Sequence, residues 1–179
     1  EAAIQAGILI DVTPTALIDD ERVELLFGMV VEMRPLDATH NESVYQVHHA
    51  LKTALGDRAK VLCQSAFAAS DISEPQPDVF VVPSGQYWDH NPTQAYLVIE
   101  VARTSINRDR GPKALLYGAS AVDEYWIVNI LQRSVEVYRD RHDGQWRTKS
   151  VHMAGETIAM LRFPDVQIQI SEIVPPRSE

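Results

Sequence analysis

The hydrophobic positions of this chain gather in short, uninterrupted runs separated by polar turns. Such runs are typical of strands that are buried on both faces of a sheet. Most of them are rich in β-branched or aromatic side chains, which favour strands over helices of the same length. The pattern predicts five strands outside the hairpins, at residues 60–69, 79–82, 96–102, 123–128 and 163–170.

Two further stretches predict hairpins. Residues 21–33 form two apolar runs on either side of Gly28, and a glycine between two β-favouring runs indicates a tight turn. Residues 134–138 and 145–151 form a second pair across the polar segment 140–144.

A helical period replaces the strand pattern after residue 38. Thr39 and Glu42 have the spacing of a capping box, and Gly56 is placed to end the helix after Leu55. His48 falls on the apolar face, which favours a hydrogen-bonded core histidine. That face comprises Val44, Val47, His48, Leu51 and Leu55.

A second helix is predicted to carry Lys113, with Asp109 as its N-cap and Pro112 in the first turn. A short helix beginning at Pro14 is also predicted. The resulting order is hairpin, helix, three strands, helix, strand and hairpin. It predicts an α/β (α+β) fold in which helices flank a mixed central β-sheet.

Composition adds limits to this picture. The chain has 179 residues and is 45% hydrophobic, which suits one domain over residues 1–179 with a substantial core. No apolar run approaches the roughly 18 residues of a membrane span, and no signal-peptide pattern opens the sequence, so we expect a cytoplasmic protein. The single cysteine, Cys63, lies in a predicted strand and is expected to be a buried, unreactive thiol.

The residue that most needs an explanation is Glu100, which lies inside the predicted buried run 96–102. A carboxylate there loses hydration that only a partner or a cation can replace. Asp78 stands at the start of the strand 79–82, and side-chain alternation puts it on the matching face of that strand. If the two strands are neighbours, Asp78 and Glu100 converge.

Lys113 follows Glu100 by thirteen residues. Two carboxylates that bind a hard cation, with a lysine for the water or the scissile phosphate, are the minimum set for a metal-dependent phosphodiesterase. The same residue types also suit a plain buried ion pair, and Pro-Asp at a strand entrance is common turn chemistry.

The net charge is −9, which argues against a protein that coats nucleic acid without specificity. The stretch 103–113 is nevertheless locally cationic, because it carries Arg103, Arg108, Arg110 and Lys113 against the single acid Asp109. Without the neighbouring acids, such a run is more typical of a solvated surface than of a phosphate-binding track.

Three other features leave alternatives open. Glu24 lies in the first hairpin, where a solvent-facing edge position accounts for it. His40, at the start of the first helix, either projects into a cleft and titrates near neutrality or is an ordinary exposed histidine. The loop at 84–93 holds Trp88 among polar residues and is a candidate for substrate contact or a dimer interface.

One ordered set of motifs resembles the bacterial Uma2 family of predicted restriction endonucleases, within the PD-(D/E)XK nuclease superfamily. The resemblance covers residues 21–174. Its motifs are Gln76-Pro77-Asp78, Leu97-Val98-Ile99-Glu100-Val101, Arg108-Asp109-Arg110, Lys113, Tyr117 and Glu124-Tyr125-Trp126-Ile127-Val128.

The resemblance implies that Asp78 and Glu100 bind Mg²⁺, for which Mn²⁺ can substitute, with help from the backbone carbonyl of Val101. It implies a catalytic role for Lys113, because the superfamily's usual lysine position is here Ala102. It also suggests roles for Glu24 and for His40.

The chain departs from the family pattern at several places. The acids that flank the hairpin glycine are replaced by Phe27 and Met29, the Ser-Pro-Ser-Thr segment after the second acid is 103–106, and the aspartate that ends the later strand is Asn129. These changes affect positions around the acids and leave Asp78 and Glu100 in place.

The resemblance implies Mg²⁺-dependent hydrolysis of DNA, with Arg103, Arg108 and Arg110 holding the DNA backbone, by a protein that pairs as a homodimer. The rival hypothesis is a domain with the nuclease fold that acts as a binding or assembly module through the loop around Trp88. The acidic charge and the altered 103–106 segment favour this rival, whereas the retained Asp78, Glu100 and Lys113 favour the enzyme.

Overall fold

A computed structural model describes residues 22–33 and 37–177 of the chain. The helix predicted after Pro14 lies outside these residues. The core of the molecule is a six-stranded mixed sheet with the strand order β10-β9-β8-β6-β4-β3. Its strands are β3 (Ala59–Cys63), β4 (Val79–Pro83), β6 (Leu97–Ala102), β8 (Tyr125–Asn129), β9 (Ser134–His142) and β10 (Gln145–Met153).

The two strands at the middle of the sheet, β6 and β8, run parallel, and every other neighbouring pair is antiparallel. All six residues of β6 and all five of β8 are buried. Burial on both faces matches the continuous apolar runs from which these strands were predicted. The structure therefore confirms the predicted mixed sheet flanked by helices.

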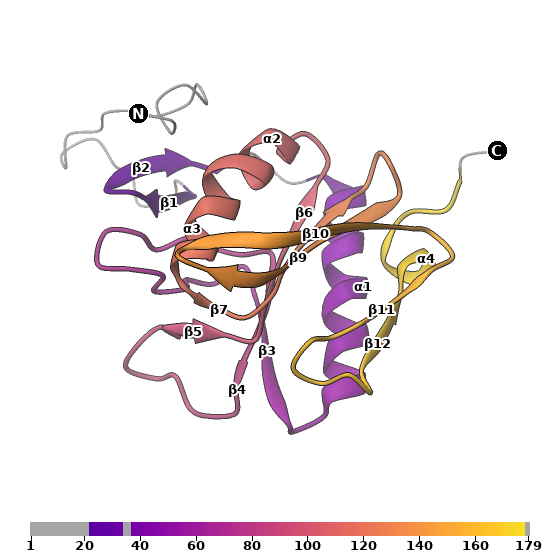
Figure 1. The fold of residues 1–179 in the computed structure, drawn as a ribbon, viewed down its shortest axis with the longest axis horizontal. Helices are drawn as coiled ribbons and strands as arrows, with labels where there is room; N and C mark the ends of the chain where they lie inside the picture. Colours follow the sequence, from indigo (N-terminus) through magenta and orange to yellow (C-terminus); the bar gives the residue numbers. More distant parts are fainter. Residues whose placement is uncertain (1–21, 34–36, 178–179) are drawn as a thin grey trace.

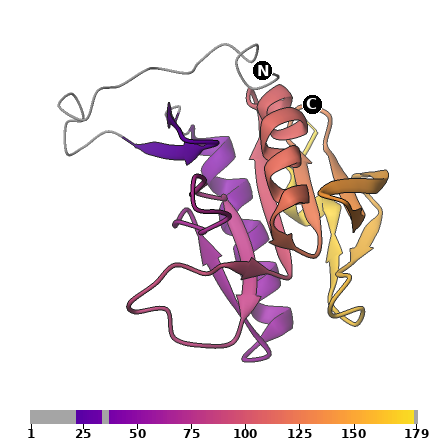
Figure 2. The same ribbon diagram turned by 60° about the vertical axis from the view of Figure 1, so that its left-hand side comes forward.

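Helices cover both faces of the sheet (Figures 1 and 2). Helix α1 (Ala38–Leu55) packs on one face with the short helix α4 (Ile170–Ile173). The core between these helices and the sheet includes Leu51 and Trp126. The opposite face is covered by α3 (Ala114–Ala119), whose Tyr117 packs with Phe80 and Ile127.

Small two-stranded sheets complete the fold. Strands β1 (Val23–Leu26) and β2 (Met29–Glu32) form the predicted hairpin, and Phe27 and Gly28 both have positive φ angles, as a tight two-residue turn requires. The other pairs are β5 (Gln94–Ala95) with β7 (Ala121–Val122), and β11 (Thr157–Ala159) with β12 (Gln167–Gln169).

The predicted start of α1 is wrong. Asp37 is the N-cap, and its Oδ1 accepts a hydrogen bond of 3.0 Å from the backbone N–H of His40. Aspartate is as good an N-cap as threonine, and the earlier start places Thr39 within the first turn. The predicted end is confirmed, because Gly56 has a φ of 57° and its N–H donates to Lys52 O.

The helix that carries Lys113 also begins earlier than predicted. Helix α2 (Ile106–Arg108) continues through a π-helical turn, η2 (Asp109–Lys113), into α3. Asp109 is therefore inside the helix and is not its cap. The wide turn contains Pro112, whose ring nitrogen has no hydrogen to donate to a normal helical bond. Such turns are frequent at functional sites.

Two further predictions on the third strand fail. The strand predicted at 60–69 ends at Cys63, because Gln64 has a φ of 46°, which an extended strand does not allow. Cys63 is exposed, since it ends β3 at the edge of the sheet.

His48 on α1 is only half-buried, so the prediction of a core histidine is also wrong.

Within the described residues, no helix is both long enough and apolar enough to cross a membrane.

The contact between α1 and the sheet should dominate stability. Leu51→Ala removes a fully buried side chain at this contact and is expected to lower the free energy of unfolding by about 2–5 kcal/mol. Urea denaturation followed by circular dichroism measures the change. The control is Thr53→Ala on the exposed side of the same helix, which should stay within about 0.5 kcal/mol of the wild type. Equal stability of the two variants would contradict this account of the core.

Candidate active site

The two acids predicted to converge lie at the meeting point of β4 and β6. The strands pair antiparallel, with Val79 opposite Ile99 and Phe80 opposite Val98. One step further along this register brings Asp78 opposite Glu100. Both residues are buried, with 8% and 3% of their surface exposed, and both line one cavity.

Asp78 is held in place by two donors that come from different elements. Its Oδ2 accepts a hydrogen bond of 2.8 Å from the backbone N–H of Val101 and lies 3.2 Å from Nε2 of His40. Burial raises the pKa of Asp78, but these two partners outweigh it, so the pKa falls below its ordinary value. His40 is buried and is brought to the acid by the first turn of α1.

Glu100 is bound from the opposite side by the helix that follows it. Its Oε1 accepts a hydrogen bond of 3.0 Å from Lys113 Nζ and one of 2.6 Å from the hydroxyl of Tyr117. Lys113 also lies 3.1 Å from Oε2 of Glu24, and it is 2% exposed. One buried ammonium thus joins an acid of the central sheet to an acid of the first hairpin.

Glu24 was expected from its position to face water, and this expectation is wrong. The residue is 2% exposed, because the hairpin packs against the body of the protein through backbone hydrogen bonds between Leu25 and Glu74. The backbone N–H of Gln76 also donates to Glu24 Oε2 at 3.3 Å.

The burial of several acids around one lysine shifts the pKa values of these groups. Burial raises the pKa of Glu100 to about 8, and the nearby carboxylates add to the effect while Lys113 opposes it. Burial lowers the pKa of Lys113, but the negative charges around it prevail and raise its pKa above the ordinary value. Burial lowers the pKa of His40, but Asp78, Asn41 and Asp37 together outweigh it, so this pKa too lies above its ordinary value.

The cavity has a volume of about 70 Å³. Two of the three arginines predicted to hold a backbone, Arg103 and Arg108, line it. Arg103 forms an ion pair of 2.6 Å with Asp37. Arg110 does not line the cavity, because its guanidinium is bound to the buried carboxylate of Glu136.

Two side chains of this site were not predicted as functional. Asp109 is 1% exposed, lines the cavity, and accepts a hydrogen bond of 2.6 Å from Ser105. Tyr117 reaches Glu100 from α3. The π-helical turn that turns Asp109 inward has no simple sequence signal, whereas the spacing of Lys113 and Tyr117, four residues apart, was enough to place both on one helix face.

The donor set suits a hard divalent cation. Among the described residues, the structure gives no hydrogen bond to the second oxygen of Asp78 or of Glu100, so one carboxylate oxygen of each is left for a ligand. Carboxylate and carbonyl oxygens are the ligands that Mg²⁺ prefers. No cluster of three histidine, cysteine, aspartate or glutamate side chains with metal-binding geometry occurs in 22–33 or 37–177, so backbone oxygen or water would have to complete the coordination.

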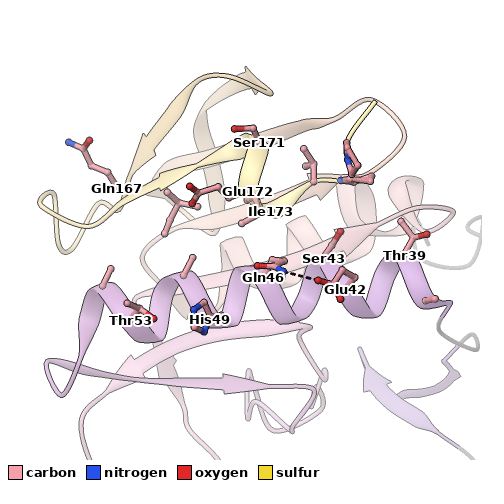
Figure 3. A pocket seen from close by; sticks show the side chains of 17 residues that line it. Thr39, Glu42, Ser43, Gln46, His49, Thr53, Gln167, Ser171, Glu172 and Ile173 are labelled. Atoms are coloured by element: carbon pink, nitrogen blue, oxygen red, sulfur yellow. Dashed lines mark hydrogen bonds between the residues drawn. The ribbon is translucent and has the colours of Figure 1, made fainter. Parts of the chain in front are cut away.

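A much larger groove lies elsewhere, between α1 and the segment that contains α4 (Figure 3). Its volume is about 1000 Å³. The side chains in view include Gln46, His49, Thr53 and Ser171, and Gln46 donates a hydrogen bond to Glu42. The groove does not include Asp78, Glu100 or Lys113, so the larger groove and the cavity with the two acids are separate features.

Comparisons with known proteins agree with the fold. A family model described as "Uma2: Putative restriction endonuclease" matches residues 15–171. Among solved structures, the chain is similar to "a putative nuclease belonging to DUF820 from Anabaena variabilis ATCC 29413", with a TM-score of 0.72, 10% sequence identity, and coverage of 89% of this chain and 93% of that one. At this identity, the likeness shows the fold. No curated protein matches the chain.

The raised pKa of Glu100 has a measurable effect on stability. The folded state holds this proton more tightly than the unfolded state, so its contribution to stability is fully present below about pH 4.5 and is lost as the pH rises towards 8. Across this range, the free energy of unfolding of the wild type should fall relative to that of Glu100→Gln, by at most about 1.4 kcal/mol per pH unit.

Urea denaturation between pH 5 and pH 8 tests this linkage. Glu42→Gln, at an exposed position on α1, provides the control and should run parallel to the wild type. A Glu100→Gln curve that is also parallel to the wild type would contradict the proton uptake assigned to Glu100.

Proposed function

This chain belongs to the Uma2 family, and on that premise we propose that it is a metal-dependent endonuclease that hydrolyses phosphodiester bonds of DNA. The observation that carries the proposal is the convergence of Asp78 and Glu100 at one cavity, with Lys113 bound to Glu100 at 3.0 Å. The proposal takes residues 1–179 as one nuclease-like domain, acting as a homodimer in the cytoplasm. Light scattering that finds one chain per particle would contradict the homodimer part of the proposal.

The cation would be held by the second oxygen of Asp78, the second oxygen of Glu100 and the backbone carbonyl of Val101. The N–H of Val101 already donates to Asp78. Because the N–H and the C=O of one strand residue point to the same neighbour, that carbonyl is directed to the same side. When bound, Mg²⁺ supplies Lewis-acid polarisation of the phosphate and a bound water of lowered pKa.

The residues around the cation site have separate tasks. Lys113 has three N–H donors, of which two are engaged by Glu24 and Glu100, so the third is left to orient water or to neutralise charge on the phosphate. His40 holds Asp78 in its position. Glu24 keeps Lys113 charged and reaches the cation through water.

We assign Arg103 and Arg108 to the DNA backbone near the scissile phosphate, and their position in the lining of the cavity supports this assignment. Arg110 is bound to Glu136, so we assign it a contact with the backbone further from the reacting phosphate. Together these cations provide a local attraction for DNA in a protein whose net charge is −9.

Cation binding and cleavage test the proposal together. Wild-type crystals soaked in Mn²⁺ should show an anomalous peak between Asp78 and Glu100, and Asp78→Asn should abolish it. In nicking of supercoiled plasmid DNA with Mg²⁺, Lys113→Ala should lower the rate at least about 100-fold, because it removes a preorganised positive charge from the site.

The matched control is Lys149→Ala, which removes a lysine that pairs with the buried Glu136 away from the cavity and should leave nicking unchanged. A missing peak together with intact plasmid would favour the binding or assembly module. Nicking that survives Lys113→Ala would contradict the assigned site.

The arginines should act on binding more than on chemistry. Each of Arg103→Gln and Arg108→Gln removes one phosphate contact, so the slope of log affinity against log salt should become shallower by about 1. Fluorescence anisotropy with a labelled duplex in Ca²⁺, over a series of salt concentrations, measures that slope. Arg58→Gln, which removes an exposed cation that pairs with Asp165 outside the cavity, should leave the slope as it is in the wild type. A slope that stays unchanged in the Arg103 and Arg108 variants would show that these residues do not contact phosphate.

A further inference from the structure

Tyr117 is the neutral partner of Glu100. Its hydroxyl donates to Oε1 of Glu100 at 2.6 Å, and its side chain is fully buried. We propose that Tyr117 is a positioning residue that fixes the Glu100 carboxylate in the orientation that presents its other oxygen to the cation. This inference rests on the proposed function, since it assigns the way in which the same site is preorganised.

The helix presents two donors to one oxygen. Lys113 and Tyr117 are four residues apart and therefore lie on the same helix face, and both end at Oε1 of Glu100. A carboxylate that is bound twice through one oxygen cannot rotate without breaking both hydrogen bonds. The arrangement leaves the second oxygen as the free acceptor of that side chain.

Of the two donors, Tyr117 is the one that is not shared with Glu24. Lys113 is shared, because it lies 3.1 Å from Glu24 as well. The ring of Tyr117 is packed against the ring of Tyr125, with centroids 4.9 Å apart, so the position of its hydroxyl is set by the core. Groups that orient metal ligands in this way contribute strongly to affinity although they do not touch the metal.

The alternative is that the Tyr117 hydroxyl only supplies a hydrogen bond to the buried carboxylate of Glu100 and has no effect on cation binding. The two roles differ in what the loss of the hydroxyl changes. If the hydrogen bond is purely structural, its loss lowers stability, and the folded variant binds the cation with the affinity of the folded wild type. Affinity for the cation in folded protein is therefore the property that separates them.

The experiment measures Mn²⁺ binding by electron paramagnetic resonance in the full chain, without DNA. Tyr117→Phe is expected to weaken binding by about 10-fold or more, in protein whose circular dichroism and thermal melting show that it is folded. The matched control is Tyr138→Phe, which removes a hydroxyl that donates to the buried Glu136 at 3.0 Å, away from the cavity, and should bind Mn²⁺ as the wild type does.

The outcomes separate this inference from the function on which it rests. Wild-type protein that fails to bind Mn²⁺, or binds it equally with Asp78→Asn, overturns both. Wild-type binding that Asp78→Asn abolishes but Tyr117→Phe leaves unchanged overturns the role of Tyr117 and retains the cation site.

A second measurement needs no variant and applies if Tyr117→Phe does not fold. In the Mn²⁺-soaked wild-type crystal, Glu100 should bind the cation through one oxygen while the other keeps its hydrogen bond to Tyr117. A cation bound by both oxygens of Glu100, with the Tyr117 hydroxyl displaced, would overturn the proposal.

Discussion

The burial of the Lys113 ammonium among acids is the interaction on which this architecture depends. Glu24 and Glu100 lie within 3.1 Å of its Nζ, and Asp109 is close enough to raise its pKa further. Removing one partner from such a cluster leaves an uncompensated charge in a low-dielectric interior, which is strongly destabilising. The cluster also joins three separate parts of the chain: the first hairpin, the central strand β6 and the helix that crosses the sheet.

The central sheet and the meeting of Asp78 with Glu100 could be predicted from the sequence. Both follow from local rules, namely apolar runs that form buried strands and side chains that alternate between faces. The register of β4 with β6 then places the two acids opposite each other. Lys113 was predicted as well, from the residue types that complete a set with the two acids and from the family resemblance, and it lies 3.0 Å from Glu100.

Other parts of the site depend on tertiary packing that the sequence does not reveal. Glu24 has the pattern of an edge-strand residue, and only the docking of its hairpin onto residues near Glu74 buries it. Asp109 has the position of a helix cap, and the earlier start of the helix at Ile106 places it inside the helix. Asp37 and Thr39 are both good caps, and the choice between them rests on one hydrogen bond to His40.

The first hairpin also constrains how the molecule assembles. Glu24 and Lys113 are 89 residues apart in the sequence, so their ion pair closes a long loop, whereas α1 and the β9–β10 hairpin are built from local contacts. Long-range contacts are made at the expense of chain entropy before they stabilise the fold, and they slow folding. During synthesis, Glu24 leaves the ribosome long before Lys113 does and stays hydrated until its partner exists. The centre where the acids meet therefore cannot be complete until Lys113 has been synthesised.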